Sequence, residues 1–467
     1  MGEVVRKNKS SETITLLLVG LIVSTFTVFA VSSSLASTVF ILLCMMLGVL
    51  LCYWVCDRRY IPQGITIFLL TLVVYVIVVV LKYFDIISEI NLFSNLDNDH
   101  YMFWVESQVG ASSSSISQIY KRCILNNEYF ENGGYFLYIQ AIAFYAEKLF
   151  DGNHLFLQLL GTALPGMLSS ILVFNLLGNY VAVDRAKKHS YLYVFLTPAL
   201  FVCLGIHRDA WIAFFYLCLV YLWLSKGSLI KTIILELVIS GLLLTLRIQN
   251  GLFAFIFIFL TLFSRAKNYR WAFYVFIGIF FIAYGSVIYS ILNDEMTSTV
   301  AYYEKLGEES LSSINSGIGR YVYQLPSPIK EVTQVLVLQA QFPPWLSIEQ
   351  ANSFWGVCVG SLLLLINFFW FFVFIYTCMM LMRRTAVKQI PSELLLSVCI
   401  FFVFALLNST NLVLRRVVCI YPCLYIVFMF LREKVISIPK SRHAFRLYAV
   451  FYGGLCLLYF IMRAVLG

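Results

Sequence analysis

Charged residues are scarce in this sequence of 467 amino acids. Only 12% of them are Asp, Glu, Lys or Arg, whereas 61% are hydrophobic; an ordinary soluble domain is about 25% charged. The apolar residues also stand in long unbroken runs, so too few polar side chains are left to cover a water-soluble body. This shortage excludes soluble enzymes, secreted disulfide scaffolds, disordered chains and coiled coils. It indicates a polytopic α-helical membrane protein.

Several sequence motifs are also missing. The chain has no P-loop, no G-x-G-x-x-G after a strand, no H-E-x-x-H and no G-x-S-x-G, so ATP-driven transport and zinc proteolysis lack support. Eleven of the twelve cysteines lie in or beside apolar runs, and only Cys123 stands in a polar loop. We interpret them as small core residues. Cys419 and Cys423 share a helical face, but no His or second Cys pair accompanies them, so no metal site is predicted.

Long apolar runs recur along the whole chain and predict an all-α transmembrane bundle, with residues 1–467 forming a single integral membrane domain. About thirteen windows are long enough to span a bilayer. They begin near Ile14, Val39, Gly64, Leu155, Ser190, Ala210, Leu229, Gly251, Trp271, Phe354, Leu394, Leu412 and Leu447. The first window follows a basic N-terminus and superficially resembles a signal peptide. A second spanning run follows at once, so we expect an uncleaved first helix.

Basic residues dominate one class of short connecting loops. Together with the basic N-terminus, these loops alternate along the chain with the remaining loops. Examples are Asp57-Arg58-Arg59, Lys187-Lys188 and Arg383-Arg384. The positive-inside rule places these loops and the N-terminus in the cytoplasm. The net charge of +9 is thus explained by topology, and no nucleic-acid partner is needed.

Two of the remaining loops are long and are expected to face outward: residues 84–134, which are rich in acidic residues, and residues 292–352. Loops of this length in a compact chain are usually functional. Residues 112–115, four consecutive serines, are expected to be a flexible spacer. Residues 135–150 are too short and too polar for a crossing, and we predict an amphipathic helix in the outer membrane interface. A tilted or re-entrant span is the alternative.

The first candidate site lies in the first outer loop, where Asp97, Asp99, His100 and Tyr101 stand close together. A carboxylate near the membrane surface can deprotonate a sugar hydroxyl or hold a divalent cation on a phosphate. The pair Asp97 and Asp99 permits such a cation without requiring one. The alternative is a solvated acidic loop in which an Asp caps a short helix.

The second candidate site is a set of arginines at outer helix ends or in outer loops. Its members are Arg208 with the adjacent His207, Arg247, Arg320, Arg415 and Arg416. Arginine near hydrocarbon depth is costly unless it is paired or faces a wet cavity, and guanidinium suits bidentate phosphate binding. A pocket for phosphate or diphosphate is therefore predicted. Snorkelling to lipid phosphates, or a salt bridge of Arg208 with Asp209, is the alternative for any single member.

Several short phrases resemble known polytopic glycosyltransferases. The acidic pair with Tyr101, the turn Asn132-Gly133-Gly134-Tyr135 and the phrase Leu149-Phe150-Asp151-Gly152-Asn153 resemble GT-C enzymes that use polyprenyl-phosphate sugars. Arg208-Asp209-Ala210 and the phrase containing Arg415, Arg416, Tyr421 and Pro422 resemble bacterial polysaccharide polymerases of the Wzy and EpsG kind. This second resemblance implies that arginines on the outer face serve polymerisation.

These observations together predict a glycosyltransferase of the bacterial inner membrane that polymerises polyprenyl-diphosphate-linked repeat units of a cell-envelope polysaccharide. Asp99, with Asp97 as second choice, would be the base, and the arginines would hold the leaving diphosphate; His100, Tyr101 and His207 are secondary candidates. The partners are lipid-linked glycans, the bilayer and other membrane proteins of polysaccharide assembly.

Two alternatives stay open: a GT-C transferase that adds a single sugar, and a flippase or transporter of lipid-linked glycan. Charged residues avoid the middles of most helices, which counts against a proton-coupled transporter.

Overall fold

The described part of the chain is entirely helical. The computed structural model describes residues 2–88, 98–126, 132–225, 227–265, 325–326, 328–341, 344–349, 351–408, 415, 417–436 and 438–466. No β-strand occurs within these ranges, so the all-α prediction is confirmed for them. The crossing predicted to begin near Trp271 and most of the predicted loop 292–352 lie outside the described residues.

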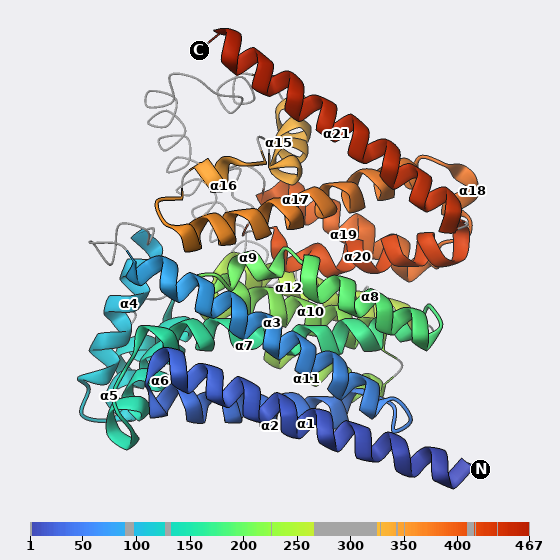
Figure 1. The fold of residues 1–467 in the computed structure, drawn as a ribbon. Helices are drawn as coiled ribbons and strands as arrows, with labels where there is room; N and C mark the ends of the chain where they lie inside the picture. The colour runs from blue at the N-terminus through green and yellow to red at the C-terminus, as the bar shows by residue number, and fades with distance from the viewer. Residues whose placement is uncertain are drawn as a thin grey trace, which may run out of the picture.

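The helices fall into an N-terminal and a C-terminal series (Figure 1). The first contains α1 (Gly2–Ser32), α2 (Leu35–Val55), α3 (Ile61–Ile87), α4 (Asn98–Ala111), α5 (Ile116–Tyr120), the π-helical turn η1 (Lys121–Leu125), α6 (Gly133–Leu149), α7 (Leu155–Gly178), α8 (Val183–Leu196), α9 (Ala199–Val202), α10 (Asp209–Leu224), α11 (Leu229–Leu246) and α12 (Ile248–Arg265). The second contains α15 (Ile329–Ala340), α16 (Leu346–Glu349), α17 (Phe354–Leu381), α18 (Arg384–Val387), α19 (Ser392–Asn408), the 3-10 turn η5 (Val418–Ile420), α20 (Tyr421–Phe430), η6 (Leu431–Val435) and α21 (Ile438–Leu466).

Seven of the described helices are long and apolar enough to cross a membrane. They are α2, α3, α7, α11, α12, α17 and the segment Lys440–Ile461 of α21. Three shorter apolar segments, Leu17–Ser32, Asp209–Leu224 and Ser392–Leu406, coincide with further predicted crossings. These helices support a membrane protein, and the count of about thirteen crossings stays a prediction.

Helix α7 forms the centre of the N-terminal series. It packs against α2, α3, α8 and α10, and its apolar window is completely buried inside the protein. A helix that is apolar on all sides suits such a position. Gly166 allows α3 to approach closely, because a Cβ there would lie 2.2 Å from the Tyr75 ring.

Helix α17 joins the two series. It packs against α3 and α8 of the N-terminal series and against α20 of the C-terminal series. At the end of α3, the buried carboxylate of Asp85 accepts hydrogen bonds from Lys82 Nζ and from Ser353 Oγ, both at 2.7 Å. Ser353 also accepts the N–H of Gly356 and so caps α17. Asp85, which was expected to begin an outer loop, therefore still belongs to α3 and ties it to the start of α17.

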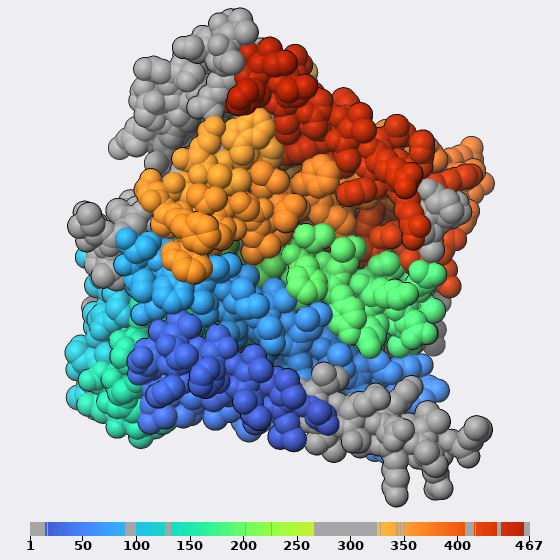
Figure 2. Space-filling view, viewed as in Figure 1, coloured from blue at the N-terminus to red at the C-terminus, as the bar shows by residue number. Residues whose placement is uncertain are grey.

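Helix α21 lies along the upper edge of the molecule in Figures 1 and 2, opposite α1 and α2. Only 11% of its apolar window is buried inside the protein. Its buried face carries Tyr448, whose hydroxyl donates to the carbonyl of Phe368 on α17 at 2.9 Å. The rest of α21 presents exposed apolar side chains such as Val450 and Phe451, as expected of a helix that faces lipid.

The connecting segments gather at two ends of the bundle. Figure 1 shows the N-terminus and α18, which begins at Arg384, at one end, and α4, α5, α6 and α16 at the other. The first end matches the predicted cytoplasmic side, and the second matches the predicted outer side. The orientation in a membrane stays a prediction.

The predicted first outer loop folds into helices that pack on α6, the segment predicted to lie in the membrane interface. Buried Gln140 of α6 donates to Glu106 Oε2 of α4 at 2.8 Å and accepts a hydrogen bond from Arg122 of η1. The expected serine spacer is also part of this structure, because Ser115 caps α5 by accepting the N–H of Gln118. The position of α6 relative to a membrane stays a prediction.

The start of α2 is capped by a carboxylate from a distant segment. Asp151, which follows α6, accepts the backbone N–H groups of Leu35 and Ala36, both at 2.8 Å, and the hydroxyl of Ser34 at 3.3 Å. Partial burial raises the pKa of Asp151, but these hydrogen bonds outweigh it, so the pKa is lowered overall. A negative charge at a helix N-terminus also interacts favourably with the helix dipole.

Asp151→Asn should lower the free energy of unfolding by about 1–2 kcal/mol, because the cap loses its charge and one acceptor. Because the pKa of Asp151 is lower in the folded protein than in the unfolded chain, this contribution is present above its ordinary pKa of about 3.9 and is lost as the pH falls through the lowered value. Thermal unfolding of the purified protein in detergent at neutral and acidic pH measures both effects.

The control for this prediction is Asp57→Asn, since Asp57 is exposed and forms only a 3.8 Å surface pair with Arg59. That variant should unfold like the wild type at neutral pH. Equal stability of the Asp151 and Asp57 variants would contradict the capping role.

Candidate functional site

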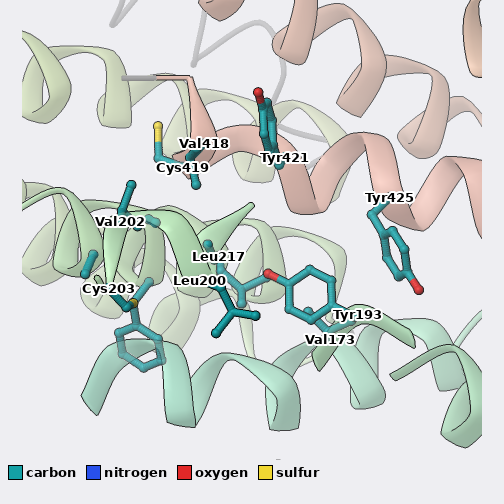
Figure 3. Packing of buried hydrophobic residues seen from close by; sticks show 14 of the residues in the cluster. Val173, Tyr193, Leu200, Val202, Cys203, Leu217, Val418, Cys419, Tyr421 and Tyr425 are labelled. Atoms are coloured by element: carbon teal, nitrogen blue, oxygen red, sulfur yellow. The ribbon is translucent and has the colours of Figure 1, made fainter. Parts of the chain in front are cut away.

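Polar side chains from five separate segments meet at the end of the bundle that carries α4 and α6. The segments are the loop between α9 and α10, the junction of α11 and α12, Arg415 just before η5, and the starts of α4 and α6. Apolar packing beneath them sets this arrangement, because η5 packs on both α9 and α10. In Figure 3, Val418 and Cys419 of η5 lie above Val202 of α9. Because η5 packs here, Arg415, which precedes it, lies near the start of α10.

Asp209, the first residue of α10, links two arginines from distant parts of the chain. Its Oδ1 lies 3.5 Å from Nη1 of Arg247, and its Oδ2 lies 3.8 Å from Nε of Arg415. The Asp209 side chain is only 5% exposed, and those of Arg247 and Arg415 are 14% and 21% exposed. A carboxylate so buried requires cationic partners, and here it has two.

His207 lies beside the same arginines. Its Nδ1 is 3.2 Å from Nη1 of Arg415, and its Nε2 is in close contact with Nε2 of His100 at the start of α4. Burial lowers the pKa of His207 well below its ordinary value, and the charges of His100 and Arg415 lower it further. The ring is therefore neutral at physiological pH and accepts a hydrogen bond on one nitrogen.

Arg208 connects the start of α6 with the end of α11. Its guanidinium donates to the side-chain oxygen of Asn132, directly before α6, and to the carbonyl of Leu246 at 3.0 Å. Leu246 is the last residue of α11, whose carbonyl groups carry partial negative charge that a cation stabilises. The turn containing Asn132 is itself tightly packed, because a Cβ on Gly134 would lie 2.2 Å from Thr245 Oγ1 of α11.

Gly205 makes room for the imidazole of His100. A Cβ at this position would lie 2.2 Å from His100 Nε2, closer than any side chain tolerates. A side chain at residue 205 would therefore displace the His100 imidazole from its present position.

The candidate residues predicted from the sequence are distributed as follows. Arg208, Arg247, Arg415, His100 and His207 lie in this cluster. Asp99 belongs to the first turn of α4, one residue before His100, although its side chain lies outside the described part of the structure. Tyr101 is 47% exposed. Asp97, Arg320 and Arg416 lie outside the described residues.

Sequence reasoning missed two members of the cluster. Asp209 was considered only as a salt-bridge partner of Arg208, whereas it pairs with Arg247 and Arg415. Asn132 was noted only as part of a phrase that resembles other enzymes. The only local signal was its position before two glycines, since its partner Arg208 is 76 residues away.

The described side chains of the cluster are predominantly basic. Its three arginines carry three positive charges, and Asp209 is the one carboxylate paired with them among the described side chains, so these residues together have a net positive charge. Guanidinium groups and neutral imidazole donate hydrogen bonds to phosphate oxygens. The described residues contain no group of three or more His, Cys, Asp or Glu side chains that could hold a metal ion.

Comparison of the chain with protein-family models, with curated proteins and with solved structures gave no match.

Asp209→Asn should lower the free energy of unfolding by about 3–5 kcal/mol, because it leaves Arg247 and Arg415 buried without their anion. Asp57→Asn removes an exposed partner of Arg59 and should cost less than about 1 kcal/mol. Thermal unfolding in detergent compares the two variants. Equal stability would show that Asp209 does not hold the arginines in place.

Proposed function

We propose that this protein is a glycosyltransferase of the bacterial inner membrane that polymerises polyprenyl-diphosphate-linked repeat units of a cell-envelope polysaccharide. The reacting end of the donor lies at the arginine cluster, and the acceptor is the terminal sugar of a second lipid-linked unit. The lipid-diphosphate bond supplies the energy, so the reaction needs no nucleotide on an outer face where ATP is absent.

The observation that carries this proposal is the buried pairing of Asp209 with Arg247 and Arg415. The pairing fixes two guanidinium groups at the end of the bundle that carries α4 and α6. A third arginine, Arg208, directly precedes Asp209 in the sequence. A diphosphate that leaves the donor sugar gains negative charge in the transition state, and fixed cations stabilise that charge. The excess of positive charge in the cluster suits this role.

Asp99 is the proposed base. It would accept the proton of the attacking sugar hydroxyl while that oxygen bonds to the anomeric carbon and the bond from this carbon to the diphosphate breaks. Asp209 is unsuited to the task, because the two arginines already engage both of its carboxylate oxygens. The first turn of α4 supports the choice of Asp99, since neighbouring His100 contacts His207 inside the cluster. Asp97 is the second choice.

A single-sugar transferase of the GT-C type is the alternative within the same class, because its phosphate-linked donor would suit the same arginines. A flippase or transporter of lipid-linked glycan is the candidate from another class. One feature favours it: Glu236 is completely buried in α11, a helix long and apolar enough to cross a membrane. Intramembrane carboxylates often mark transport pathways.

Deletion of the gene separates these three activities. A polymerase predicts that single lipid-linked repeat units persist while the ladder of long glycan chains disappears on a gel of cell-surface polysaccharide. Long chains whose every unit lacks one sugar would instead identify a single-sugar transferase. Units that accumulate on the cytoplasmic face would identify a flippase and overturn the enzyme proposal.

Asp99→Asn should reduce polymerisation at least about 100-fold, the usual contribution of a general base, while the protein is still produced at the wild-type level. The ladder in a deletion strain that carries the variant measures this effect. The control is Glu147→Gln, which neutralises an exposed carboxylate on α6 and should restore the full ladder. A full ladder with Asp99→Asn would remove Asp99 from the role of base.

A further inference from the structure

Helix α11 contains a carboxyl group that the proposed reaction does not use. Glu236 is the eighth residue of α11 (Leu229–Leu246), and its side chain is 0% exposed. It lies on the face of α11 that packs against α12. Eleven residues separate it from Arg247, which is about 16 Å along a helix, so it does not belong to the arginine cluster.

The contacts of Glu236 leave one of its oxygens unsatisfied. Oε1 accepts a hydrogen bond from Thr261 Oγ1 of α12 at 2.6 Å, whereas Oε2 has no hydrogen-bond partner among the described residues. Ser240 follows one turn later on the same face of α11, and its hydroxyl is also fully buried and unpartnered within the described ranges. Two buried polar atoms on one helix face thus lack the hydrogen bond that buried groups normally make.

The arginine on the facing helix does not form an ion pair with Glu236. Arg265 donates to the carbonyls of Leu222 and Trp223 at the end of α10, at 2.7 and 2.8 Å, and to Thr232 Oγ1 at 3.2 Å. These acceptors occupy its guanidinium. Among the described residues, no cation lies within ion-pair distance of the Glu236 carboxyl group.

A charged carboxylate in this position would be buried at high cost, because the described residues give it a single hydroxyl donor and no ion-pair partner. One added proton removes the charge and also supplies a donor that can satisfy a neighbouring oxygen such as Ser240 Oγ. We propose that Glu236 is a proton-binding site inside the α11–α12 hairpin, and that the neutral carboxyl links the two helices. This inference does not rest on the proposed glycosyltransferase activity.

The proton makes Glu236 a target for an apolar carbodiimide. The carboxyl proton moves to one nitrogen of dicyclohexylcarbodiimide while the carboxylate oxygen bonds to its central carbon. The adduct then rearranges to a stable N-acylurea by transfer of the acyl group from oxygen to nitrogen, and no atom leaves. Exposed carboxylates in water are charged at neutral pH and lack the proton that begins this reaction.

The test is to treat the purified full-length protein in detergent with dicyclohexylcarbodiimide at neutral pH and to locate the adduct by peptide mass spectrometry. We expect modification at Glu236 and none at Glu147, an exposed carboxylate on α6 that serves as the matched control. An infrared spectrum should also contain the carbonyl band of a protonated carboxyl that Glu236→Gln abolishes. A properly folded protein with neither the adduct nor this band would overturn the proposal.

Two further measurements test whether Glu236 binds a proton. Glu236→Gln replaces the neutral acid by a neutral amide and should unfold at the wild-type temperature, whereas a marked loss of stability would mean that a charged carboxylate is required. Sodium chloride and choline chloride should leave the labelling equal. Protection by sodium chloride alone would overturn the proton assignment and identify a sodium ion among these oxygens.

Discussion

The pairing of one buried carboxylate with two arginines is the interaction on which the polar end of this bundle depends. Asp209 stands at the start of α10, and its partners come from the end of α11 and from the residue before η5. Neither arginine could stay so close to the other, or so far from water, without the anion between them. His207 contacts one of these arginines, Arg415, and also contacts His100 of α4.

Hydrophobic length and the placement of charge predicted much of the fold. Runs such as those of α7 and α17 are long and apolar enough to cross a bilayer, and a helix satisfies all backbone hydrogen bonds of such a run within itself. The sequence was less informative about the segments that connect these runs. The first outer loop is also more structured than expected, because the hydrogen bonds of Gln140 to Glu106 and Arg122 join residues far apart in the chain.

The sequence predicted most of the residues that belong to the candidate site, but not which of them contact one another. An arginine at the end of an apolar run is visible in any sequence, and its cost in such surroundings is a local property. Its partner is not local: Asp209 meets Arg247 across 38 residues, and His207 meets Arg415 across 208. A separation of 76 residues likewise concealed Asn132 as a partner of Arg208. Glu236 was equally visible, yet only the packing of α12 shows that its carboxyl is sealed from solvent.

The cap of α2 has a consequence for biosynthesis. Ala36 receives its acceptor from a residue made 115 positions later, a delay of about 6–23 s at ordinary rates of translation. During that interval the N–H groups at the start of α2 lack their protein acceptor. Water or lipid headgroups must therefore accept hydrogen bonds from those N–H groups until Asp151 is made. The cap of α2 is thus completed only after α6 has been made.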